Sequence, residues 1–348
     1  MEARSVRLGG WIGLLLVAPL CAQEVPRLAR PVEDGTWIRP AEGEASEPVW
    51  GVKGGIAVGL WPTGGPRGLL RVYTPYLDHP RLRMINYIAV EPIVGRSRGL
   101  SELERSALDG VDGRAMWTTD ERPTTADAIE PWKPARGVTA REGDVETLTF
   151  WVCVEPFTNG ARPLVRVRFR SDRRHEVELT TFAAEGSARM KACVLTATMG
   201  NYARLRRLWL ADETVEAAEL WKEPRLNRWG FVDAREWPLD RLLVREGEVL
   251  VAVTPDEEDP ESATYDDSVP PWWRYKGKVA TQYWSTSPVE DLVARVNGRA
   301  TFWATKAPIP GGIAFENFEL VAPFADGQVF RFGVTPAPPT SLGFERKR

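Results

Sequence analysis

The segment FENFEL places two carboxylates, Glu316 and Glu319, among aromatic side chains. Because side chains alternate along a strand, Glu319 and Asn317 share one face and Glu316 lies on the other. Whichever face is buried therefore holds a carboxyl group in apolar surroundings, where desolvation raises its pKa toward the range of a general acid or base. Both glutamates are candidate catalytic residues and Asn317 is a candidate ligand-binding residue. The structural alternative is an ordinary ion pair on the strand.

Two further residues have the right chemistry for proton transfer. His79 lies in the loop sequence YLDHPRLR and would form an acid–base pair if the fold brought it to Glu316 or Glu319; otherwise it is a surface histidine. Glu91 ends the apolar run YIAVE and precedes a proline. Proline cannot donate to a sheet and keeps the preceding residue extended, so Val-Glu-Pro predicts a strand end with its glutamate at the sheet rim. Glu91 is a secondary catalytic candidate.

The same pattern recurs in WVCVEPFTNGAR, which contains Glu155. In both copies an arginine, Arg98 or Arg162, follows the glutamate at the same spacing. The recurrence favours a structural role, in which Val-Glu-Pro ends a buried strand and a nearby arginine balances the charge.

An aromatic cluster with interleaved cations occupies the sequence PPWWRYKGKVATQYW. Aromatic rings stack on the apolar faces of sugars, while an arginine can hydrogen-bond their hydroxyl groups. The two adjacent tryptophans cannot face the same side of an extended segment, so we expect one to be exposed. The candidate ligand-binding residues here are Trp272, Trp273, Arg274, Tyr275 and Trp284. The alternative is a loop that packs over the edge of the fold.

Metal and cofactor chemistry have little support in the sequence. The acidic loop at 256–267 offers oxygen ligands for calcium but lacks the alternating spacing of a calcium loop, so a solvated loop is expected. The chain has two histidines, and outside the first 22 residues its cysteines are Cys153 and Cys193, which form one disulfide or stay as thiols. No G-x-S-x-G, H-E-x-x-H, P-loop or dinucleotide motif occurs. We expect no metal and no cofactor.

The elements that must position these residues are strands. Apolar and polar side chains alternate in ETLTFWVCV and LVRVRFR, and the glutamates of HEVELTTF can face the arginines of LVRVRFR across a hairpin through SDRR. In LVARVNGRATFWA, Asn297–Gly298 predicts a two-residue hairpin turn. Further strands are predicted at KACVLTAT, RLRRLWL, EVLVAVT, KVATQYW, GIAFENFELV and QVFRFGV.

Helical signals are scarce. Ser101 and Glu104 match a capping box and predict a short helix over 102–108, whereas DETVEAAELW fits either a helix or a strand. Many strands with proline- and glycine-rich connections, and no alternating β–α pattern, predict an all-β fold. We expect a large antiparallel β-sandwich, similar to a supersandwich, with one or two short helices.

The first residues have the order of a secretory signal peptide: two arginines, a short apolar core, then small residues ending at Ala22. Leu20 disfavours lipid attachment at Cys21. The expected location is secreted or periplasmic, and no later apolar run is long enough to span a membrane. The predicted organisation is signal peptide 1–22, N-terminal arm 23–48, a single β-sandwich domain 49–335 and a disordered tail 336–348.

The composition, 43% hydrophobic and 27% charged, is that of a globular protein, and a net charge of −3 disfavours nucleic acid as a partner. Fifteen tryptophans suit a β-rich core and also suit sugar-binding faces.

The segments INYIAVEPIVG, GLSELERSALDG, LTATMGNYARLR and GGIAFENFEL together resemble an uncharacterised family of secreted bacterial proteins. More distantly, the length, the all-β pattern and a late strand glutamate are similar to galactose-mutarotase-like supersandwiches, which bind or act on carbohydrate. In that family a histidine serves as acid and a C-terminal glutamate as base. The resemblance implies Glu316 or Glu319 as the base, whereas neither His79 nor His175 lies in a recognisable motif of that family.

The sequence predicts an exported protein that binds a carbohydrate or glycan. If the protein is an enzyme, we expect Glu316 or Glu319 to perform acid–base chemistry on a sugar, with His79 or Arg274 assisting. The alternative is a non-catalytic extracellular or envelope module that binds a protein partner.

Overall fold

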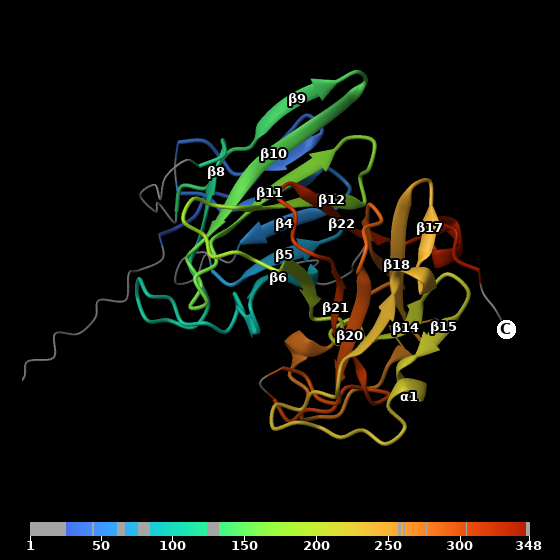
Figure 1. Ribbon diagram of the computed structural model, residues 1–348. Coiled ribbons are helices and arrows are strands. Elements are labelled where there is room, and N and C mark those ends of the chain that lie inside the picture. The colour runs from blue at the N-terminus through green and yellow to red at the C-terminus, as the bar shows by residue number, and fades with distance from the viewer. Residues whose placement is uncertain are drawn as a thin grey trace, which may run out of the picture.

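In the part of the chain that the structure describes, the strands form two large antiparallel sheets of eleven strands each (Figure 1). The computed structural model describes residues 26–43, 45–60, 67–75, 84–123, 132–256, 259, 262–275, 277–303 and 305–345. Nearly all of the regular structure is strand, so the prediction of an all-β sandwich is confirmed.

Sheet 1 combines the N-terminal strands with strands from the C-terminal half of the chain. Its order is β1 (Val32–Asp34), β2 (Trp37–Arg39), β3 (Val49–Val52), β4 (Ala57–Leu60), β5 (Leu69–Tyr73), β6 (Met84–Val94), β13 (Ala192–Thr198), β21 (Ala314–Val321), β20 (Val293–Arg299) and β16 (Arg235–Pro238), with β7 (Ser97–Arg98) beside β6.

Sheet 2 contains the strands with the clearest alternation. Its order is β15 (Thr214–Glu216), β14 (Leu205–Trp209), β18 (Glu248–Pro255), β19 (Thr281–Thr286), β22 (Gln328–Thr335), β12 (Glu176–Ala183), β11 (Pro163–Arg170), β10 (Val145–Val154) and β8 (Met116–Thr119), with β17 (Leu243–Arg245) beside β18 and β9 (Val138–Glu142) beside β10. Strands β11 and β12 pair as predicted, with Arg168 opposite Glu178.

Tryptophan rings occupy much of the space between the sheets. Trp50 of β3 stacks on Phe150 of β10, with ring centroids 4.1 Å apart. Trp284 of β19 donates its indole N–H to the carbonyl oxygen of Phe318 in β21 at 2.9 Å. Both tryptophans are fully buried, and a buried ring of this size removes about 150–250 Å² of surface from water. These contacts join the two sheets into one core.

Helical structure is limited to short elements. Those with all their residues in the described part of the chain are α1 (Ala217–Leu220) and the 3₁₀ turns η1 (Leu239–Arg241), η3 (Pro271–Trp273) and η4 (Pro339–Leu342). The segment DETVEAAELW contains both β15 and α1. The helix predicted over 102–108 does not form: this segment folds as consecutive turns, because the Ser101 hydroxyl binds the sheet instead of capping a helix.

The hairpin turn predicted at Asn297–Gly298 is also wrong. Strand β20 continues through both residues, with a bulge in its pairing with β21 between Val296 and Gly298. The side-chain oxygen of Asn297 accepts the backbone N–H of Asn317 at 3.0 Å. An asparagine side chain therefore takes a place in the sheet ladder, and the glycine serves the bulge rather than a turn.

Regular structure extends beyond both ends of the predicted domain, 49–335. The N-terminal arm supplies β1 and β2 at the edge of sheet 1. The tail forms η4, and Phe344 is 2% exposed against Trp209 and Tyr283. Residues 336–345 are therefore folded, which corrects the predicted disorder there. The predicted signal peptide, including Cys21, lies outside the described residues.

Two further findings concern the core and the membrane. Cys153 and Cys193 are both buried, are not joined by a disulfide and lie in different sheets. Among the helices of the described residues, none has the length and apolar character needed to cross a bilayer.

Candidate functional site

A group of polar side chains lies on the outer face of sheet 1. Arg295 of β20 is opposite Glu319 of β21, and Thr196 of β13 donates its hydroxyl to the Glu319 carboxylate. Glu91 of β6 is opposite Val194, two residues from Thr196 on the same strand. Opposed residues in antiparallel strands point to the same face. The alternate residues of these strands face the core, so the register alone gathers the polar ones on the outside.

Arg98 joins two of these carboxylates. Its Nε donates to Glu91, and its two terminal nitrogens donate to the two oxygens of Glu319 at 3.2 and 2.7 Å. Burial lowers the pKa of Arg98, but the attraction of Glu319 and Glu91 outweighs it and raises that pKa overall. The side chains of both glutamates are 3% exposed and that of Arg98 is 24% exposed. The Arg98 side chain is therefore more exposed than the two carboxylates that it joins, and Arg295, which pairs with Glu319 at 3.7 Å, is 34% exposed.

Glu102 reaches the same cluster from a turn segment that Ser101 fixes to the sheet. Where the pairing of β5 with β6 ends, the Ser101 hydroxyl accepts the N–H of Val90 at 2.9 Å and donates to the carbonyl oxygen of Gly68 at 2.5 Å. An added Cβ on Gly68 would lie 3.2 Å from the Cα of Glu102. The serine thus completes the ladder, and the small residue at 68 leaves room for Glu102 to pack against it.

The carboxyl group of Glu102 has an unusual environment. Burial raises its pKa to about 7, with a further upward contribution from Glu319 and an opposing one from Arg98. Its Oε2 atom is buried and has no hydrogen-bond partner. Burial and the charge of Glu102 likewise raise the pKa of Glu91. Because Glu91 is paired directly with Arg98, we take Glu102 as the carboxyl group of this pair that exchanges a proton near neutral pH.

Half-buried polar side chains continue the outer face beside this cluster. Asn317 of β21 is opposite Thr198 of β13 and accepts its hydroxyl at 2.7 Å. Arg71 of β5 is opposite Tyr87 of β6, with its guanidinium 5.2 Å from the ring centroid. Burial raises the pKa of Tyr87, so its phenol stays protonated. This face therefore presents guanidinium, amide, hydroxyl and phenol groups, all able to hydrogen-bond a polyhydroxylated ligand.

Three sequence candidates, Glu319, Glu91 and Asn317, come together here. The environment predicted for Glu91 was wrong, because it lies inside β6 and is 2% exposed. Pro92 is tolerated within β6, where its carbonyl oxygen accepts the N–H of Gly99 as β7 folds back along the strand. Glu155 does follow the end of β10, but it too is buried.

Glu316 faces the opposite side of the sheet, into the core. It is 2% exposed, and its Oε2 atom has no hydrogen-bond partner. Burial raises its pKa to about 8 despite the attraction of Arg299. Glu316 is thus mostly protonated at pH 7, and it faces away from the Arg98 cluster, although the charge of Glu102 also raises its pKa.

The aromatic candidates are not gathered at this face. Tyr275 and Trp284 are 1% and 0% exposed and offer no ring face to a ligand, which corrects the prediction for both. Trp273 is half-buried and stacks on Phe302 at 5.5 Å in a small satellite core. Arg274 donates to the carbonyl oxygen of Val269 at 3.0 Å. The packed-loop alternative therefore describes this segment. His79 and the side chain of Trp272 lie outside the described residues.

Sequence reasoning missed the part played by Glu102, Thr196 and Arg295. The position of Arg98 after Glu91 was a usable signal for the ion pair. For Glu102 the capping-box pattern pointed to a helix instead, and nothing local indicates that Ser101 bonds to two strands.

Within the part of the chain that the structure describes, no group of three or more His, Cys, Asp or Glu side chains could hold a metal ion. Comparison with models of known protein families found none that matches the chain, and comparison with curated proteins found no match.

Proposed function

We propose that this protein binds a carbohydrate on the outer face of sheet 1 and that Glu102 exchanges a proton with the bound sugar. The observation that carries the proposal is the Glu102 carboxyl group, whose pKa is raised to about 7 and which lies within electrostatic reach of Arg98, a side chain that is 24% exposed. A group with this pKa has both its acid and its base form populated at neutral pH, which suits general acid–base chemistry.

The neighbouring residues have complementary roles in this proposal. Arg98, Arg295 and Asn317 orient sugar hydroxyl groups by hydrogen bonds, as polar groups do in binding sites. Glu319 holds Arg98 in place and is saturated by Arg98 and Thr196. The resemblance to galactose-mutarotase-like proteins suggests Glu316 or Glu319 as the base, but Glu316 faces the core and both oxygens of Glu319 are engaged by Arg98 and Thr196. Glu102 therefore takes that role.

A glycan array with the wild-type protein and the Asn317→Ala variant tests the binding claim. Asn317 is half-buried at the surface of the site, so its replacement removes an amide without opening the core. We expect the wild type to bind a defined set of glycans and the variant to bind the same set about tenfold more weakly, the loss of roughly one hydrogen bond to a polar ligand. Absence of binding to any glycan by the wild type would favour the non-catalytic, protein-binding alternative.

A further inference from the structure

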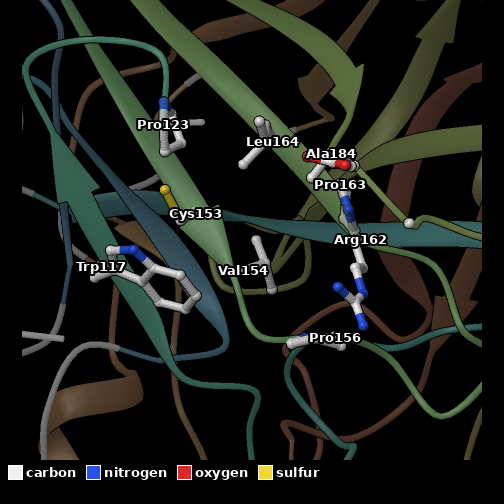
Figure 2. A pocket seen from close by; sticks show the side chains of 11 residues that line it. Trp117, Pro123, Cys153, Val154, Pro156, Arg162, Pro163, Leu164 and Ala184 are labelled. Carbon is white, nitrogen blue, oxygen red and sulfur yellow. The ribbon is translucent and has the colours of Figure 1, made fainter. Parts of the chain in front are cut away.

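A cavity of about 400 Å³ lies on the outer face of sheet 2 (Figure 2). Its floor follows one register row: Trp117 of β8 is opposite Cys153 of β10, which is opposite Leu164 of β11. Cys153 and Leu164 are 1% and 6% exposed, so the floor is apolar and closely packed. The remaining lining residues are Pro123, Val154, Pro156, Arg162, Pro163, Ala184, Glu185 and Gly186.

The cavity has an indole on one side and a cation on the other. Figure 2 shows Trp117 across the opening from Arg162, with Cys153 and Val154 between them. The indole nitrogen of Trp117 is buried and has no hydrogen-bond partner. The ring of Trp117 therefore contributes an apolar wall to the cavity rather than a hydrogen-bond donor.

Arg162 is an unused cation at this cavity. The Val-Glu-Pro pattern suggests Glu155 as its partner, but Glu155 pairs with Arg114 at 3.4 Å instead. Among the described residues no ion pair joins Arg162 to a carboxylate. Gly186 lies beside the guanidinium with φ +71°, and an added Cβ would lie 3.5 Å from its nitrogen. The backbone around Arg162 is held by Ser187 and Ala184, so its side chain is presented from a fixed position.

We propose that this cavity binds a small carboxylate with an apolar body. The body lies over Cys153 and Leu164 against the ring of Trp117, and the carboxylate accepts hydrogen bonds from the guanidinium of Arg162, a geometry that favours paired N–H donors and carboxylate oxygens. Glu185 is exposed at the rim and carries the opposite charge to Arg162. Its negative charge repels an anionic ligand. Removing that charge is therefore expected to tighten the binding of a carboxylate, whereas removing Arg162 is expected to weaken it.

Ligand-observed nuclear magnetic resonance with 4-phenylbutyrate and its neutral amide, 4-phenylbutyramide, tests the site on the full protein. We expect the carboxylate to bind and the amide to bind about tenfold more weakly, because only the carboxylate forms charge-assisted hydrogen bonds. Arg162→Gln should weaken the carboxylate by a similar factor and leave the amide unchanged, whereas Glu185→Gln should tighten the carboxylate. Arg174→Gln is the matched control, an exposed arginine before β12 at the other end of the same hairpin.

Ala184→Phe locates the bound probe, since a phenyl group there fills part of the cavity. We expect this variant to lose binding of both compounds while keeping the thermal stability of the wild type. Three results would overturn the proposal: no binding of 4-phenylbutyrate by the wild type, equal affinity for acid and amide, or binding that survives in Ala184→Phe.

Discussion

At the scale of single residues, the environment of a carboxyl group decides its role more than its place in a motif. Glu319 and Glu102 lie in one cluster around Arg98, yet Glu319 accepts hydrogen bonds from Arg98 and Thr196, whereas one oxygen of Glu102 accepts none. The pKa of Glu316 is raised further, to about 8, but this residue faces the core. Glu102 combines a pKa raised to about 7 with a place in the outer-face cluster.

Replacing Glu102 with glutamine should change how stability depends on pH. The pKa rises from 4.5 to about 7 on folding, so the folded state holds this proton more tightly than the unfolded state. The resulting stabilisation is present below pH 4.5 and is lost as the pH rises to about 7. Glutamine cannot ionise, so we expect Glu102→Gln to gain roughly 2–3 kcal/mol relative to wild type between pH 4.5 and pH 8. Urea unfolding at both pH values measures this gain, and parallel pH profiles would contradict it.

At the scale of elements, the site depends on how turns and bulges join the strands. Ser101 bonds across the end of the β5–β6 ladder and so fixes the turn that carries Glu102. The bulge in β20 lets Asn297 bond the backbone of Asn317 on the neighbouring strand. Both contacts are made by short polar side chains that replace a backbone partner in the sheet.

Ser101→Ala should destabilise the protein by about 1–3 kcal/mol, because it leaves the N–H of Val90 and the carbonyl of Gly68 buried without a partner. Urea unfolding measures the loss. The control is Ser341→Ala, whose hydroxyl bonds only the carbonyl of Pro338 at an exposed turn and which should change stability by less than about 0.5 kcal/mol. Equal losses in the two variants would show that Ser101 has no special role in the ladder.

The strands could be predicted from the sequence because alternation is a local property. The β11–β12 hairpin and β21 follow directly from it. The misreadings share one cause, which is that the deciding contact is distant in sequence. Nothing near Ser101 indicates that it bonds Gly68, and nothing in Asn297–Gly298 indicates that Asn317 lies opposite. For the same reason the site could be predicted only in part, through residues on β21 and β6.

At the scale of the whole molecule, the large number of tryptophans serves mainly to join two broad sheets. Trp50 and Trp284 are fully buried in the core between them, and Trp209 packs under the C-terminal tail. The tryptophan count therefore carries little information about a sugar-binding face. The outer face of sheet 1 is polar, whereas that of sheet 2 has an apolar patch around Trp151 and Leu164. The two faces suit different ligands.

The packing of the C-terminal tail against sheet 2 should contribute measurably to the free energy of unfolding. Phe344 is buried against Trp209, Ala252 and Tyr283. We expect Phe344→Ala to lower the free energy of unfolding by about 3 kcal/mol, the usual cost of removing a buried ring. A loss below about 0.5 kcal/mol, measured by urea unfolding, would mean that the tail is not docked in solution.

The binding of a carbohydrate to the outer face of sheet 1 is best tested by comparing the glycan affinities of two arginine variants, one on this face and one on sheet 2. Arg98 is unsuitable for this purpose, because its removal leaves two buried carboxylates without a counterion. Arg295 is 34% exposed on the proposed face, and Arg207 is a matched arginine, 25% exposed and paired with Glu216 on sheet 2.

Calorimetric titration with the glycan that the wild type binds best on the array measures these affinities. We expect Arg295→Gln to bind about tenfold more weakly than wild type and Arg207→Gln to bind as wild type does. Equal affinities of the two variants, or a loss confined to Arg207→Gln, would contradict it.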